Sequence, residues 1–134
     1  MRRSTEPPAR APTHDRIEAF DFGFRPEHVI AAPFATRQLA DMGARVIKVE
    51  RPGTGDFARG YDERVRGLAS HFVWTNRSKE SLTLDVKHPD AQAILRDLIR
   101  THADVVVQNL APVAAARLGL DLHLAAQPVK VGLD

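Results

Sequence analysis

Three polar side chains stand directly after apolar stretches that are typical of β-strands. Arg51 follows RVIKVE, Lys87 follows SLTLDV and Asn109 follows VVVQ. Because the carboxyl ends of parallel strands share one edge of a sheet, we expect the three to lie where open α/β sheets bind ligands. A helix predicted to begin at Pro89 would add the positive end of its dipole there. An arginine, a lysine and an amide beside a helix start suit phosphate groups, although three solvated strand ends explain the composition equally well.

The glycine-rich stretch after the first of these strands resembles a dinucleotide-binding motif. Gly53–Ala58 matches G-x-G-x-x-A and follows a strand, as that motif does. Pro52 precedes it, however, and no amphipathic helix opens at Gly55. The stretch therefore predicts a plain glycine-rich turn.

Other common catalytic chemistries find no support in the sequence. There is no cysteine, which excludes disulfides, thiolate zinc sites and cysteine nucleophiles. The six histidines show neither an i, i+4 pair nor a spacing to carboxylates that indicates a metal site. Ser70 and Ser78 lack the nucleophile-elbow motif of a serine hydrolase. We expect no metal site and no catalytic residue in this chain.

The composition is that of one soluble globular domain. The 134 residues are 43% hydrophobic and 27% charged, with a net charge of +2, which is weak support for nucleic-acid binding. No apolar run approaches the roughly 20 residues of a membrane span, and the absence of cysteine fits a reducing, cytoplasmic setting. Residues Met1–Asp15 contain three prolines and no periodicity, so we expect a disordered leader before a domain that covers residues 16–134.

Helices and strands alternate along the rest of the chain. Apolar spacing predicts helices over Pro33–Met42 and Pro89–His102, the second with His88 as a poor N-cap. β-Branched or alternating apolar residues predict strands over 45–50, 81–86 and 103–108. The order strand 81–86, helix 89–102, strand 103–108 is a βαβ unit. The sequence signals are weaker in five other segments. They indicate a short or irregular strand within 16–30, a loop over 51–66, a mixed segment over 67–76, a short helix over 113–118 and a strand beginning at 129. The pattern predicts an α/β fold.

Four motifs then carry a family resemblance. VIKVERPGTGD, NRSKESLTLDVKHPD, ADVVVQNLAP and RLGLD occur in this order, and the stretch from about Pro33 to Asp121 closely resembles the family III CoA-transferases. The resemblance implies part of a Rossmann-like large domain, with a mainly parallel sheet and flanking helices, in an interlocked homodimer. It also implies that acyl-CoA and a carboxylic acid are substrates and that no cofactor is bound covalently. Whether the chemistry is CoA transfer or the related racemisation stays open.

The resemblance also implies which residues contact CoA. They comprise the arginine after the second strand, the end of the L-D-x-K strand, the segment after the next strand, the arginine of the R-L-G motif and an early loop. In this sequence they are Arg51; Leu84, Asp85, Val86 and Lys87; Asn109, Leu110 and Ala111; Arg117; and Ile30 and Ala31.

Two departures from the family pattern bear on activity. The first-strand region carries about four extra residues by our alignment, and Ala32 stands where the family has glycine. The family's catalytic aspartate lies well downstream of Asp121, and the sequence ends at Asp134. We therefore expect these residues alone to lack transferase activity. The alternative is a non-catalytic remnant or an α/β binding module.

Overall fold

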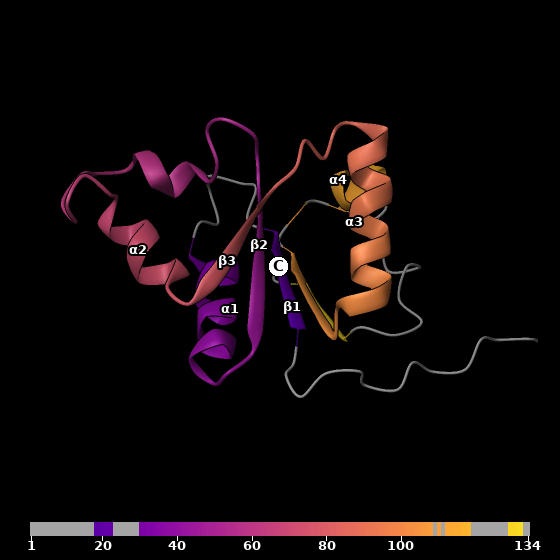
Figure 1. Ribbon diagram of the computed structural model, residues 1–134, viewed down its shortest axis with the longest axis horizontal. Coiled ribbons are helices and arrows are strands. Elements are labelled where there is room, and N and C mark those ends of the chain that lie inside the picture. The colour runs from indigo at the N-terminus through magenta and orange to yellow at the C-terminus, as the bar shows by residue number, and fades with distance from the viewer. Residues whose placement is uncertain (1–17, 23–29, 109, 111, 119–128, 133–134) are drawn as a thin grey trace, which may run out of the picture.

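The computed structural model describes residues 18–22, 30–108, 110, 112–118 and 129–132. The predicted leader, residues 1–15, lies outside this range. Five strands form one sheet in the order β3-β2-β1-β4-β5, and every neighbouring pair is parallel (Figure 1). The strands are β1 (Glu18–Phe22), β2 (Arg45–Glu50), β3 (Lys79–Thr83), β4 (Val105–Gln108) and β5 (Val129–Gly132). The helices are α1 (Ala31–Asp41), a 3-10 turn η2 (Phe57–Gly60), α2 (Ser70–Asn76), α3 (Pro89–His102) and α4 (Pro112–Arg117). The expected α/β fold is confirmed.

The chain adds strands first on one side of β1 and then on the other. The chain builds β1, β2 and β3 outward on one side, and α3 then carries it back to β4 on the other side of β1. The predicted βαβ unit therefore exists, but β2 and β1 lie between its two strands. In doubly wound sheets such a switch point leaves a crevice beyond the carboxyl ends of the strands.

Strand β1 is the centre of the sheet. Phe20 pairs with Ile47 of β2 on one side and with Val106 of β4 on the other. Ala19 and Phe20 are completely buried. The short strand expected somewhere within residues 16–30 thus has a larger structural role than its sequence indicated.

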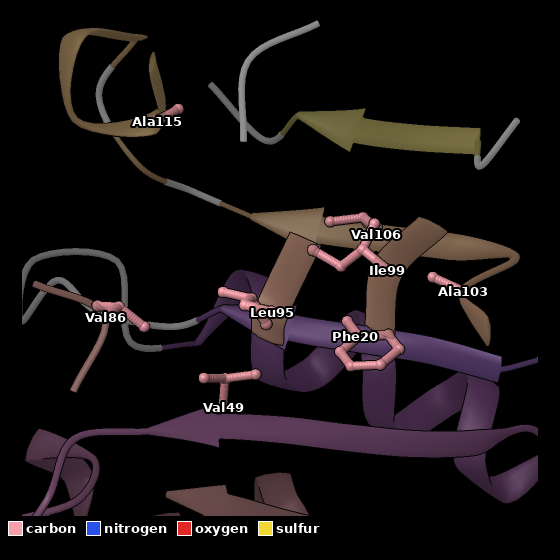
Figure 2. Packing of buried hydrophobic residues seen from close by; sticks show 8 residues of the cluster. All are labelled: Phe20, Val49, Val86, Leu95, Ile99, Ala103, Val106 and Ala115. Atoms are coloured by element: carbon pink, nitrogen blue, oxygen red, sulfur yellow. The ribbon is translucent and has the colours of Figure 1, made fainter. Parts of the chain in front are cut away.

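Helices pack on both faces of the sheet (Figure 1). On one face, Leu39 and Ala40 of α1 pack with Ala19 and Val46. On the other face, Leu95 and Ile99 of α3 lie against Phe20 of β1 and Val106 of β4 (Figure 2). Burial on both faces explains why these strands are apolar runs without strict alternation.

Helix α3 begins and ends where the sequence predicts. Pro89 occupies the first turn, where its missing N–H leaves no intrahelical bond unmade. The Nδ1 atom of His88 accepts a hydrogen bond from the Asp90 N–H at 3.2 Å. The predicted N-cap is confirmed.

Several predicted elements have different bounds in the structure; the strand predicted over residues 103–108, for example, starts only at Val105. The strand predicted over residues 81–86 is shifted, because β3 starts at Lys79 and ends at Thr83. The Leu84 N–H still donates to the Glu50 carbonyl at 3.0 Å, but β2 ends at Glu50 and offers no further partner. Helix α1 begins at Ala31, two residues earlier than predicted.

The mixed segment over residues 67–76 contains a helix whose cap comes from a distant residue. Asp62 accepts hydrogen bonds from the Ser70 N–H at 2.9 Å and from the Ser70 hydroxyl at 2.7 Å. The residue immediately before the helix, Ala69, makes no such side-chain bond. Local capping rules therefore could not locate this helix.

Within the described residues, every helix is too short or too polar to cross a lipid bilayer.

Candidate functional site

A cavity of about 980 Å³ opens at the carboxyl edge of the sheet. It is formed by the residues after β2, the turn between β3 and α3, the start of α3, and α4 with the segment before it. Its lining consists of Arg51, Pro52, Asp85, Val86, Lys87, Gln92, Leu110, Val113, Ala114, Arg117 and Leu118.

The lining combines basic and apolar side chains. Arg51, Lys87 and Arg117 contribute positive charge, and among the described residues of the lining only Asp85 is acidic. The first turn of α3 begins two residues after Lys87, so the positive end of its dipole lies at the same edge. Such a combination favours an anionic ligand, and phosphate groups in particular.

The guanidinium of Arg51 is held by two neighbours in its own loop. Its Nε and Nη2 atoms donate to the Gly55 carbonyl at 3.2 and 3.0 Å. Its Cζ atom lies 3.9 Å from the centroid of the Phe57 ring, within the range of a cation–π interaction. The side chain therefore enters the cavity from a defined position.

The turn after β3 is fixed from both ends. The Lys87 N–H donates to the Asp85 carboxylate at 3.1 Å, and the Gln92 side-chain amide of α3 donates to the Val86 carbonyl at 2.9 Å. Val86 is buried in the core cluster (Figure 2), whereas the neighbouring Lys87 is exposed. The turn thus anchors one residue in the core and directs the lysine toward solvent and the cavity.

The apolar side of the cavity comes from α4 and the residue that precedes it. The Leu110 N–H donates to the Gln108 side chain at 2.6 Å, which ties this segment to the end of β4. Val113 is largely exposed and lines the cavity one helical turn before Arg117. Helix α4 therefore offers an apolar surface with an arginine at its end.

A buried carboxylate, Glu50, organises the loop that carries Arg51. It accepts hydrogen bonds from Arg59 Nε and Nη2, both at 2.8 Å, and from the Ser81 hydroxyl at 2.8 Å. The Asp56 N–H donates to it at 2.9 Å. Burial by itself would raise the pKa of Glu50, but these hydrogen bonds outweigh it and lower the pKa to about 2.

Charged side chains are also buried between the sheet and α1. Lys48 Nζ lies 2.6 Å from the Asp56 carboxylate and 3.6 Å from that of Asp21. Lys79 Nζ lies 2.9 Å from Asp21 and also donates to Thr36 Oγ1 at 2.7 Å. Burial lowers the pKa of Lys79 to about 8, against the opposing attraction of Asp21. This cluster was not predicted from the sequence, because its charged members come from three strands and a loop.

The structure brings most of the expected site residues together. Arg51, Asp85, Val86, Lys87, Leu110 and Arg117 all line the one cavity. Leu84 packs against the hydrophobic core and is not part of the lining, and neither are Ile30 and Ala31 at the start of α1. Asn109 and Ala111 lie outside the described residues.

Sequence reasoning did not identify five further lining residues. Pro52 adjoins Arg51 in the chain, and Gln92 lies in the first turns of α3. The other three, Val113, Ala114 and Leu118, belong to α4 or directly follow it. The i, i+4 spacing of Val113 from Arg117 was the available signal, because residues four apart share a helix face.

Residues 25–127 match the sequence profile of CoA-transferase family III. This match covers most of the chain, and the chain belongs to that family. The family resemblance that the four sequence motifs indicated is therefore confirmed.

The chain is similar in sequence to two named CoA-transferases. Over 106 residues the chain is 42% identical to a formyl-CoA:oxalate CoA-transferase of Rhodopseudomonas palustris, an alignment that covers 78% of this chain and 24% of that enzyme. It is also 42% identical over 94 residues to an acetyl-CoA:oxalate CoA-transferase of Acetobacter aceti, covering 70% of this chain and 24% of that enzyme. The chain thus spans about a quarter of the length of these relatives.

Solved structures agree with the fold. A CAIB/BAIF family protein from Brucella suis superposes with a TM-score of 0.74 at 28% identity, over 85% of this chain and 31% of that one. A hypothetical protein from Mycobacterium tuberculosis superposes with a TM-score of 0.71 at 33% identity, over the same shares of the two chains.

Proposed function

We propose that this chain is the CoA-binding, N-terminal portion of a family III CoA-transferase. One observation supports this above all others. Six of the residues that the family resemblance assigns to CoA contacts line a single basic cavity at the carboxyl edge of the sheet. Segments that lie far apart in the sequence contribute them, so a chance grouping is a weak explanation.

The cavity offers the two kinds of surface that CoA requires. The phosphates would lie against Arg51, Lys87 and Arg117, which can form charge-assisted hydrogen bonds with them. Less polar parts of the ligand would lie along Leu110 and Val113, in the part of the lining formed by α4 and the residue that precedes it. A volume of about 980 Å³ is at the upper end of small-molecule sites, which range up to about 1,000 Å³.

We further propose that residues 1–134 bind CoA without transferring it. In the family mechanism an aspartate attacks the acyl-CoA thioester, giving a mixed anhydride and then an aspartyl-CoA thioester, before CoA passes to an acceptor carboxylate. The family pattern puts that aspartate downstream of Asp121, and we propose that residues 1–134 do not include it. In a protein that also supplies it, we propose a cytoplasmic homodimer that uses an acyl-CoA and a carboxylic acid. Within the present chain, residues 16–134 would form the domain, preceded by a leader over 1–15.

Isothermal titration calorimetry with coenzyme A tests the binding proposal. We expect micromolar binding to the unmodified chain, weakened about tenfold or more in Arg51→Ala and in Lys87→Ala, because each removes a charge-assisted contact. Arg100→Ala is the matched control. It removes one arginine from the exposed far end of α3, where Arg100 pairs with Asp97, and should bind CoA normally.

The outcomes separate the two candidate functions. Absence of CoA binding to the unmodified chain would overturn the proposal and favour a remnant or a binding module for another ligand. Equal weakening by all three substitutions would show that only net charge matters. Incubation with formyl-CoA and oxalate should give no oxalyl-CoA, and its formation would contradict the proposed lack of transferase activity.

A further inference from the structure

We propose that Gly55 and Phe57 are positioning residues that orient Arg51 for CoA before the ligand arrives. The inference rests on the proposed CoA site and extends it to two residues that do not line the cavity. Both lie in the glycine-rich stretch after β2, for which the sequence predicted no more than a turn.

Gly55 holds the guanidinium through its carbonyl group. That one oxygen accepts from both Nε and Nη2 of Arg51, at 3.2 and 3.0 Å. In return the Gly55 N–H donates to the Arg51 carbonyl at 3.1 Å. These bonds tie side chain and backbone into one closed loop and leave the Nη1 group outside it.

Phe57 supports the same guanidinium from a ring face. The Arg51 Cζ atom lies 3.9 Å from the ring centroid. Phe57 is 38% exposed, so it contributes less to the core than a fully buried phenylalanine does. Its ring face instead contacts an arginine that lines the cavity.

The buried Glu50 carboxylate fixes the shape of this loop. It binds the N–H of Asp56, which directly precedes Phe57, and the guanidinium of Arg59, two residues after Phe57. Gly55 has a φ of +63°, and a Cβ atom there would lie 2.6 Å from Glu50 Oε2 and 2.9 Å from Arg59 Cδ. Any other residue would strain the backbone at this positive φ and displace the Glu50 and Arg59 side chains that shape the loop.

The expected benefit is a lower entropic cost of binding. A free arginine side chain samples many rotamers, and a ligand that fixes it loses affinity accordingly. An arginine already held by Gly55 and Phe57 avoids most of that loss. We therefore expect the loss of the aromatic ring to weaken CoA binding about threefold to tenfold.

The test compares coenzyme A affinities by calorimetry in a set of single and double variants. Phe57→Leu should weaken binding, Phe57→Trp should retain it, and Phe57→Leu should have no further effect once Arg51 is alanine. Phe34→Leu is the matched control, because Phe34 is 37% exposed and has the Arg37 guanidinium 6.0 Å from its ring centroid. It lies on α1, away from the cavity lining, and should leave CoA binding unchanged.

Arg51→Lys provides a second, independent readout. Lysine keeps the charge but has neither the planar fork for the Gly55 carbonyl nor the flat surface for the ring. We expect it to bind CoA several-fold more weakly, with an unchanged salt dependence. Circular dichroism and thermal melts of each variant confirm that it is folded.

The results distinguish this inference from the proposal on which it depends. If the unmodified chain does not bind CoA, the proposed function fails. If it binds and Arg51→Ala weakens binding, but Phe57→Leu and Arg51→Lys bind like the unmodified chain, only the positioning role is refuted. A full additional loss from Phe57→Leu in the Arg51→Ala background would also refute it, because Phe57 would then act independently of Arg51.

Discussion

Replacing Glu50 with glutamine tests whether one buried carboxylate stabilises the loop that carries Arg51. Glu50 is 3% exposed and accepts four hydrogen bonds, two of them from the Arg59 guanidinium. Glutamine has nearly the same shape but no charge. Its amide NH₂ group would face donors that the carboxylate now satisfies, so at least one hydrogen bond is lost.

The magnitude follows from the pKa of Glu50. The pKa falls from 4.5 to about 2 on folding, which corresponds to about 3 kcal/mol of stability at neutral pH. The Arg59 side chain is 40% exposed, so solvent screening reduces this to roughly 2–3 kcal/mol. Because the folded pKa is the lower one, this contribution is complete above pH 4.5 and is lost as the pH falls toward 2.

Urea denaturation at several pH values measures this contribution. We expect Glu50→Gln to lower the free energy of unfolding by roughly 2–3 kcal/mol at neutral pH, with the gap to the unmodified protein narrowing steadily below about pH 4.5. Glu80→Gln is the control, because Glu80 pairs with Arg45 Nε and Nη2 at 2.9 Å in a similar fork but is 58% exposed. Glu80→Gln should lower the free energy of unfolding by less than about 1 kcal/mol.

Two results would refute the reasoning. If Glu50→Gln and Glu80→Gln lower the free energy of unfolding by the same amount at neutral pH, burial does not strengthen the Glu50–Arg59 pair. If the cost of Glu50→Gln persists undiminished in acid, it arises from altered packing and not from the charge.

Three further substitutions test other parts of the fold. Leu95→Ala removes a fully buried side chain from the α3 core and should lower the free energy of unfolding by about 2–5 kcal/mol in urea titrations; a loss below about 1 kcal/mol would contradict this packing. The folded pKa of Lys79, about 8, lies below its ordinary 10.5. The free energy of unfolding of the unmodified protein should therefore rise by up to about 3 kcal/mol as the pH rises from about 8 to 10.5, and Lys79→Met should lack that rise. Parallel stability–pH curves for the two proteins would contradict this prediction. Gly55→Ala should cost more stability in thermal melts than Gly53→Ala, because both have positive φ but a Cβ meets other atoms only at Gly55; equal costs would show that backbone strain alone matters.

The sequence correctly predicted the elements whose signals are local. Strand β2 has the predicted bounds, because a β-branched run lies between a glycine turn and Pro52. Helix α3 has them as well, because Pro89 marks its start and its apolar face has helical spacing throughout. Such signals depend only on neighbours within a few residues, so they predict an element without knowledge of the rest of the fold.

The candidate site was predictable in outline. Parallel strands must end at a common edge, so Arg51 and Lys87 could be placed at one edge from their positions after strands. The family resemblance supplied Leu110 and Arg117. The contributions of Gln92 and Val113 were missed, because facing the cavity depends on how each helix is rotated against the sheet.

Only the tertiary structure decided which distant residues meet. It placed a short, irregular-looking segment at the centre of the sheet as β1, and it capped α2 with Asp62. It also paired Asp21 with Lys79 across 58 residues of sequence and closed the Arg51 loop around Glu50. Local propensity carries no information about such contacts, because their free energy arises only when strands pair and water is excluded from the charges between them.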